Sequence, residues 1–215
     1  MSTTTRPAAG RGRRGGDTRL RIEQAAATLF TEHGYTGTSI QAVADAAGVH
    51  AQTIYQAYGT KAVLLGAVGA RLVAGEDDPT THPSERAWVL RIQAEPDPVR
   101  KLRLYVEHIA AVTPRVVALI DMLRATAPAE PDAAAFLDQI EQERHLGPLN
   151  LLAPLAEQGQ LREGLTLAAA SDITYALVNP DTFRALALQR GWTWKRTQRW
   201  LTDCLTNALL PPPKP

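Results

Sequence analysis

The sequence has few of the residues that build disulfide frameworks, cysteine-ligated metal sites or β-sheets. Its 215 residues include a single cysteine, Cys204, which excludes an internal disulfide and a zinc site built from cysteines. Aromatic residues make up only 6% of the chain and alternating β-branched runs are rare, so no strand is predicted. This cysteine usage fits a reducing cytoplasm.

Long apolar runs and a strong charge of one sign are also missing. No stretch approaches membrane-spanning length, and the early arginines are not followed by the apolar segment of a secretory signal, so we expect a cytoplasmic protein without a membrane partner. The net charge of +1 argues against a nonspecific nucleic-acid packaging protein. The charge is uneven, because residues 1–61 carry seven basic and four acidic side chains, as expected when one end of a protein meets phosphates.

Alanine and leucine are abundant instead, and they favour an all-α fold. Residues 1–16 lack periodicity and predict a flexible basic arm, residues 17–62 a three-helix unit, and residues 63–215 a larger helical bundle. Proline and glycine divide the bundle into expected helices at 84–94, 98–112, 113–125, 132–146, 149–157, 167–178, 181–189 and 193–210. In the third of these, Asp121 and Arg124 are spaced for a local ion pair, which we favour over the polar floor of a pocket.

The three-helix unit has the signals of a helix-turn-helix. Asp17 is a predicted N-cap, followed by an apolar stripe from Ile22 to Phe30 on a helix that ends before Gly34. Thr38 and Gln41 have capping-box spacing, and Gly48 can adopt the left-handed turn before the next helix. On that helix Ile54 and Tyr58 are one turn apart and are expected to pack inward.

The outward face of residues 50–56 suits the reading of DNA. A recognition helix needs short polar side chains that reach base edges. Gln52 can bond adenine bidentately, Thr53 offers a hydroxyl and a methyl group, and Ala51 can approach a thymine methyl group. Tyr55 is better suited to a phosphate oxygen, and His50 and Gln56 complete the predicted DNA-facing set.

Further predicted DNA contacts flank this helix. Lys61 opposes the dipole of its own helix, which is unfavourable unless an anion such as a DNA phosphate lies nearby. Free amide groups near Thr38, Ser39 and Thr60 can bind phosphates as well. The arm contributes three arginines that can follow the backbone or enter a minor groove: Arg11, Arg13 and Arg14. The alternatives are a helical hairpin inside a bundle and an arm that only aids solubility.

The segments IEQAAATLF, HGYTGTSI, VADAAGV, TIYQAY and KAVLL, between Arg21 and Leu65, resemble the amino-terminal domain of TetR-family transcriptional regulators. The resemblance implies that residues 40–46 form the supporting helix, that residues 50–56 read DNA, and that Tyr55 and Lys61 contact phosphates. The sequence departs from the family pattern at His50, where a capping serine is common, and at Tyr58, where phenylalanine is usual.

The carboxy-terminal segment from residue 155 to 210 resembles one TetR branch more loosely. The resemblance implies a four-helix dimer interface from residues 167–178 and 193–210, and a small-molecule site in residues 88–136. The expected interface residues are Ile173, Leu177, Trp194, Trp200, Leu201, Leu205 and Leu209. The expected ligand-binding residues are Trp88, Tyr105, His108, Met122 and Phe136. The alternative at each of these positions is an ordinary intrachain core residue.

An enzyme is the main rival. No nucleophile–base arrangement, phosphate-binding loop or dinucleotide fingerprint stands out, and Glu141 with His145 does not make a metal site, so no catalytic residue, metal or cofactor is predicted. The sequence thus predicts a homodimeric DNA-binding regulator. By resemblance, it is a repressor released from an inverted-repeat operator by a small-molecule effector. The alternative is a regulator that activates transcription or lacks an effector.

Overall fold

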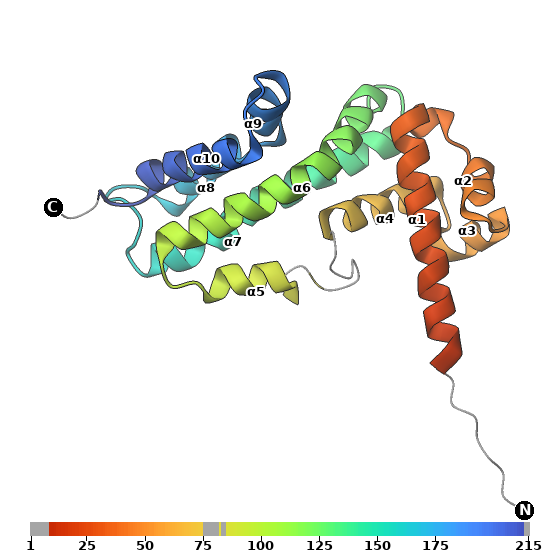
Figure 1. Cartoon of the computed structure of the whole chain (residues 1–215), viewed down its shortest axis with the longest axis horizontal. Helices are drawn as coiled ribbons and strands as arrows, with labels where there is room; N and C mark the ends of the chain where they lie inside the picture. The colour runs from red at the N-terminus through yellow and green to blue at the C-terminus, as the bar shows by residue number, and fades with distance from the viewer. Residues whose placement is uncertain (1–8, 75–81, 83–84, 213–215) are drawn as a thin grey trace, which may run out of the picture.

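The computed structural model describes residues 9–74, 82 and 85–212, and all regular structure within these ranges is helical, which confirms the predicted all-α fold. Figure 1 shows a small group of helices at one end and a longer bundle beside it. The small group contains α1 (Ala9–Gly37), α2 (Ile40–Ala47), α3 (Ala51–Tyr58) and α4 (Lys61–Ala74). The bundle contains α5 (Ala87–Ala94), α6 (Pro98–Thr126), α7 (Pro131–Glu157), α8 (Leu167–Leu177), α9 (Pro180–Phe183), a π-helical segment (Arg184–Gln189) and α10 (Trp194–Leu209).

The predicted helix-turn-helix is present. The backbone leaves the helical conformation at Gly34, where φ is 73°, and the α2–α3 turn passes through Gly48 at φ 64° and ψ 43°. A side chain at either glycine would be strained in this left-handed region. The amide of Gly48 donates back to carbonyls of α2, which ends that helix and turns the chain towards α3.

Two predicted helix starts are wrong. The first helix begins at Ala9, so Asp17 lies inside it and residues 9–16, assigned to the arm, form its first turns. Four of these eight residues are glycine, which disfavours helix, so no local signal predicted these turns, which continue the packed part of α1 outward. The second helix is capped by Ser39, whose hydroxyl accepts from the amide of Ala42 at 3.1 Å, and not by Thr38.

Prolines do not end the long helices as predicted. Residues 98–112 and 113–125 form the single helix α6 with Pro114 inside it, and residues 132–157 form α7 with Pro148 and Pro154 inside it. An interior proline costs about 3 kcal/mol because it removes a hydrogen bond and crowds the preceding turn. Val112 and Val117 are buried on the two sides of Pro114. Pro148 is itself buried with Leu151, Leu152 and Leu155 after it, and burial of this kind offsets the cost.

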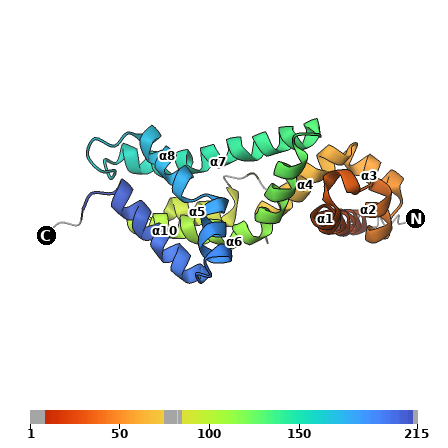
Figure 2. The same ribbon diagram turned by 90° about the horizontal axis from the view of Figure 1, so that it is seen from above.

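Two apolar cores organise the molecule, and α6 contributes to both. The amino-terminal core joins α1–α4 to the far part of α6 and the start of α7, through Leu119, Leu123 and Ala133. The carboxy-terminal core gathers α5, the near part of α6, the end of α7, α8 and α10. Figure 2 shows α6 and α7 running lengthwise from α4 towards α8 and α10. Helix α6 is central to the fold, since it contacts α1, α4, α5, α7, α9 and α10.

The polar residues of α6 pair with α9 and the π-helical segment instead of with each other. Both terminal nitrogens of Arg184 donate to the carboxylate of Asp121, and Arg124 pairs with Asp181 at 2.9 Å. The expected ion pair between Asp121 and Arg124 is therefore wrong. Each side chain finds a bidentate or charged partner on a neighbouring element, which is a stronger interaction than a local pair along one helix.

Candidate nucleic-acid interface

Helix α3 separates into a buried and an exposed face, as expected. Ile54 and Tyr58 are buried, whereas Gln52, Tyr55 and Gln56 are exposed. Ala51 and Thr53 are half-buried at the edges of the exposed face, and His50, the exposed N-cap residue, makes no side-chain capping bond. Tyr55 is 50% exposed, a large aromatic surface for a monomer to leave in water. The face therefore presents amide, hydroxyl and phenol groups together.

A buried polar cluster holds α3 against its neighbours. The hydroxyl of Tyr58 donates to the carboxylate of Glu23 on α1 at 2.9 Å, and Arg71 on α4 pairs with the other oxygen of that carboxylate. Burial, followed by the charge of Glu23, raises the pKa of Tyr58 well above its usual value, so the phenol stays protonated as a donor. Glu23, Tyr58 and Arg71 thus fix α3 in position.

The sequence reasoning missed Glu23 and Arg71. A signal for Glu23 was present, because it precedes Ala26 by three residues and Phe30 by seven and so shares their buried face of α1. A carboxylate on an apolar stripe needs a partner. Its two partners, Tyr58 and Arg71, lie 35 and 48 residues further along the chain, so spacing within one helix could not identify them.

Thr38 is the predicted DNA contact that the structure contradicts at the side chain. It is 2% exposed, and its hydroxyl faces the carbonyl oxygens of Gly34 at 2.8 Å and Leu29 at 3.0 Å. These bonds close the chain over the end of the first helix, so the hydroxyl is not available to a phosphate. Ser39 is exposed next to it and caps α2.

Lys61 has internal partners that the sequence did not predict. Its ammonium donates to the carbonyl oxygens of Tyr35 at 2.9 Å and Thr38 at 3.2 Å, and lies 4.1 Å from the centre of the Tyr35 ring. The argument that this cation needs an external anion is therefore wrong, because carbonyl dipoles and an aromatic face stabilise it. An ammonium has three donors, and these two bonds leave one for a phosphate.

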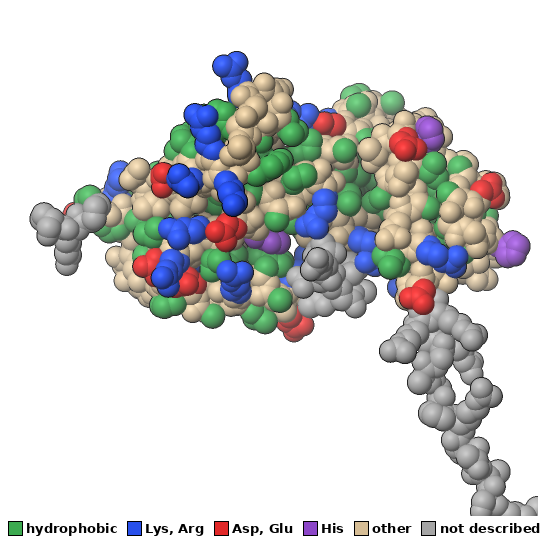
Figure 3. All heavy atoms as spheres, viewed as in Figure 1, with side chains coloured by type: hydrophobic (Ala, Val, Ile, Leu, Met, Phe, Trp, Pro, Cys, Tyr) green, Lys and Arg blue, Asp and Glu red, His purple; other side chains and the backbone are tan. Residues whose placement is uncertain are grey.

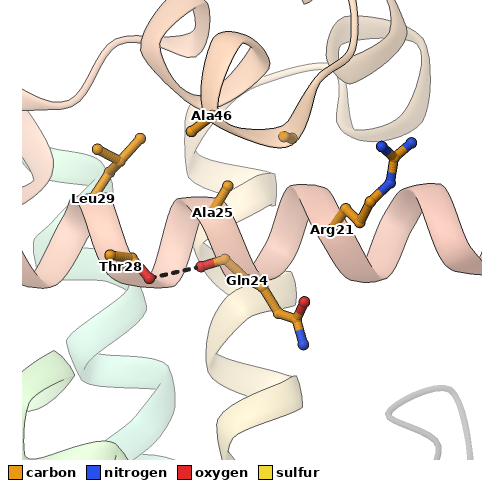
Figure 4. A pocket seen from close by; sticks show the side chains of 7 residues that line it. Arg21, Gln24, Ala25, Thr28, Leu29 and Ala46 are labelled. Atoms are coloured by element: carbon orange, nitrogen blue, oxygen red, sulfur yellow. Dashed lines mark hydrogen bonds between the residues drawn. The ribbon is translucent and has the colours of Figure 1, made fainter.

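A shallow groove separates α1 from α2. In Figure 4, the small side chains of Ala25 and Ala46 lie between the two helices, and Arg21 extends from α1 beside the α2–α3 turn. A nitrogen of the Arg21 guanidinium lies 3.7 Å from where a Cβ of Gly48 would stand. Arg21 therefore adds a cation beside the helix-turn-helix that was not among the predicted contacts.

On the face drawn in Figure 3, the basic side chains of the described residues do not form one patch. Arg11, Arg13 and Arg14 belong to the first turns of α1, and their side chains lie outside the described part of the structure. On the face drawn in Figure 3, Lys and Arg side chains occur at both ends of the molecule with acidic side chains between them. Cationic contacts near α3 are thus individual side chains such as Arg21 and Lys61.

Three of the predicted interface residues are core residues. Leu201, Leu205 and Leu209 have no exposed surface and belong to the carboxy-terminal core, so their assignment to a dimer interface is wrong. They form the inner stripe of α10, which packs on α6 and α8. The others retain surface: Trp200 is 38% exposed, and Ile173, Leu177 and Trp194 are half-buried.

The five predicted ligand-binding residues do not line one site. Trp88 and His108 stack with ring centres 3.6 Å apart, and Tyr105 is buried in the same carboxy-terminal core. Met122 and Phe136 pack instead against the amino-terminal core, where the Phe136 ring fills the space over Gly69 on α4. The prediction of one pocket lined by all five residues is therefore wrong. The long helices α6 and α7 contribute to both cores, so residues on these two helices are divided between the cores.

Two hydrogen bonds tie the end of α1 to the start of α7 at the amino-terminal core. The hydroxyl of Tyr35 donates to Asp132 at 3.2 Å, and Thr36 donates to Glu130 at 3.3 Å. Burial, followed by the charge of Asp132, raises the pKa of Tyr35 to about 12.

No helix within the described residues is both long and apolar enough to cross a membrane.

Residues 22–68 match the model of the family described as bacterial regulatory proteins, tetR family. No curated protein matches the chain. A solved structure from Rhodococcus sp., described as a TetR-family transcriptional regulator, has a TM-score of 0.68 and 18% identity and covers 90% of this chain and 99% of its own. The fatty acid degradation regulator FadR from Bacillus halodurans has a TM-score of 0.67 and 18% identity, with 86% and 96% covered.

A third structure, described as a transcriptional regulator from Saccharomonospora viridis in complex with choline, has a TM-score of 0.67 and 16% identity, with 92% and 100% covered. At such identities the solved structures establish the likeness of the fold, and the family model establishes the nature of the first domain. Residues 22–68 therefore match the tetR family model, and the chain as a whole has the fold of the solved TetR-family transcriptional regulators that it resembles.

Proposed function

We propose that this chain is a homodimeric, sequence-specific DNA-binding regulator, and that it represses transcription from an inverted-repeat operator until a small-molecule effector releases it. The observation that supports this most directly is α3. The cluster of Glu23, Tyr58 and Arg71 braces its inner face, while Gln52, Tyr55 and Gln56 remain exposed on the other. A rigid helix with short polar side chains outward is what reading a major groove requires.

The contacts divide by chemistry. Gln52, Thr53 and Ala51 are suited to base edges, whereas Tyr55, Lys61, Ser39 and the amide groups at the start of α2 and α4 are suited to phosphates. Lys61 holds the chain before α2 by its carbonyl contacts and offers its remaining N–H to a phosphate. Base contacts set which sequence is preferred, and phosphate contacts set affinity for every sequence.

Dimerisation is proposed through the outer surfaces of α8 and α10. One short helix contacts too few bases for selectivity, whereas a two-fold dimer reads half-sites about 34 Å apart or a multiple of that distance. Trp200 is partly exposed on α10 and meets Trp192 edge to face at 6.0 Å, which provides aromatic surface for a partner. Figure 2 shows α8 and α10 at the end away from α2 and α3, so pairing there leaves both α3 helices free.

Effector control is proposed to act through α6 and α7, which carry residues of both cores. An effector must bind the released conformation more tightly than the DNA-bound one. The solved relative from S. viridis holds choline, which supports a small-molecule site in this fold. The sign of the regulation follows from the family resemblance.

Quantitative binding of the purified chain to a randomised double-stranded pool tests the proposal. We expect an inverted repeat, and Gln52→Ala should change the preferred bases while Tyr55→Phe weakens all sequences alike. Trp200→Glu should give monomers in analytical ultracentrifugation, with Leu90→Glu, at an exposed position on α5, as the matched control. A monomer that ignores every duplex in dilute buffer would refute the proposal.

A further inference from the structure

The amino-terminal end of α5 contains buried donor groups that have no acceptor. Arg86, the residue before the helix, is 8% exposed, and its Nε atom is buried without a hydrogen-bond partner. The indole nitrogen of Trp88, two residues on, is also buried without a partner. Buried polar groups are rarely left unpaired, because each costs roughly 1–3 kcal/mol, more when charged.

Within the described part of the chain, Arg86 has no acidic side chain as an ion-pair partner. None of the ion pairs among the described residues includes Arg86 or Arg115. Helix α5 also lacks a side-chain cap and has no acidic residue in its first turn, so its own first turn supplies no counterion to the positive end of the helix dipole. The positive charge of the buried Arg86 guanidinium and the positive end of the α5 dipole therefore lie at the same end of this helix.

Aromatic rings stand beside these donors. The Trp88 and His108 rings are nearly parallel, at 10°, with their centres 3.6 Å apart. Burial, followed by the charges of Arg115 and Arg86, lowers the pKa of His108 to about 4, so its imidazole is neutral near pH 7. Arg86 precedes α5 and Arg115 lies on α6, and the positive charges of both disfavour a protonated imidazole at His108.

We propose that Arg86, Trp88 and His108 bind an organic anion with a planar, apolar body. Guanidinium, indole and helix-end amide groups are all donors, so their complement is an acceptor that carries negative charge. The Trp88–His108 stack offers a flat apolar wall for the rest of the molecule. The choline of the S. viridis relative has the opposite charge, so the ligand classes of the two proteins differ. The inference rests on the proposed function in one respect, namely that this anion is the effector.

Calorimetric titration of the full-length protein with three compounds of one shape tests the binding. The probes are 1-naphthoate, 1-naphthyl phosphate and the uncharged 1-naphthamide. We expect at least one anion to bind about tenfold or more tightly than the amide, since a charge-assisted hydrogen bond to a guanidinium is worth at least that ratio. The stronger of the two anions identifies a carboxylate or a phosphate ligand.

Arg86→Met should abolish the preference for the anion, and Arg91→Met, at an exposed position on the same helix, should preserve it. A second measurement needs no ligand. Replacing an unpaired buried charge by an apolar side chain of similar length should raise the melting temperature of the free protein. Arg184→Met, which removes the partner of Asp121, should lower it.

Equal affinity for the three compounds overturns the proposal, as does an Arg86→Met variant that melts lower or keeps its preference for the anion. DNA binding is measured separately, without any probe. If the protein binds no duplex but prefers an anion through Arg86, the proposed function fails and the anion site stands. If it binds an inverted repeat and discriminates no anion, the reverse holds.

Discussion

The phenol of Tyr58 on α3 donates a 2.9 Å hydrogen bond to the carboxylate of Glu23 on α1, although the two residues lie 35 positions apart. The bond joins the proposed recognition helix to the first helix inside the amino-terminal core. Its acceptor is charged and buried, so its loss leaves a carboxylate with fewer donors. The position of α3 depends on it.

Tyr58→Phe should therefore lower the free energy of unfolding by about 1–2 kcal/mol, measured by urea denaturation. The effect is limited because Arg71 still pairs with Glu23. Tyr55→Phe is the matched control, because the Tyr55 side chain is exposed and its stability should change by less than about 0.5 kcal/mol. Equal stabilities of the two variants would show that the buried bond contributes nothing.

Lys61→Met should affect both folding and DNA binding. It removes two donors to the carbonyl oxygens of Tyr35 and Thr38, which should cost roughly 1–2 kcal/mol of stability. If the third donor meets a phosphate, the slope of log affinity against log salt should fall by about one. Lys195→Met, at an exposed position on α10, is the control and should leave that slope unchanged. An unchanged slope for Lys61→Met would restrict the residue to its structural role.

Gly69→Ala should destabilise the contact between α4 and α7. An added methyl group would overlap the ring of Phe136, which must then move within a packed core, at a cost of roughly 1–3 kcal/mol. Gly66→Ala, on the same helix with open space around it, should instead be neutral or stabilising, because alanine favours helix. Thermal denaturation compares them. Adding Phe136→Leu should recover most of the loss at Gly69, and additive effects would contradict the contact.

The neutral His108 should make stability fall on acidification. Its pKa is lowered from 6.5 to about 4 in the folded protein, so between these values the unfolded chain binds a proton that the folded chain does not. Stability is then fully present above the unfolded pKa and is lost as the pH falls towards about 4. Between about pH 7 and pH 5, the free energy of unfolding should fall by about 1–2 kcal/mol less in His108→Gln than in the unmodified protein, measured by denaturant unfolding. Parallel pH profiles for both proteins would contradict a neutral His108.

The helix-turn-helix was predictable because its determinants are local. Gly48 marks a left-handed turn and the spacing of Ile54 and Tyr58 marks an inward face, and both depend only on neighbouring residues. The cap of α2 was misplaced by one residue, because Thr38 and Ser39 are both capping types and only the fold shows which hydroxyl is taken by Gly34 and Leu29.

Long-range pairs could not be predicted in the same way. The partners of Asp121 and Arg124 lie on α9 and the π-helical segment, about 60 residues later, so a short sequence distance suggested the wrong pair. The prediction that Trp88, Tyr105, His108, Met122 and Phe136 line one pocket failed for a related reason. A stripe on a sequence shows that side chains are buried, but it does not show in which of two cores they are buried.

Pro114 gives α6 an uneven stiffness. It follows Ala110, in the carboxy-terminal core, and precedes Leu119, in the amino-terminal core. A proline has no amide hydrogen, so the helix lacks one rung of its hydrogen-bond ladder between the two cores. Bending α6 at that turn breaks fewer bonds than bending it elsewhere, so a change in the angle between the two halves of the molecule would concentrate its curvature around this one residue.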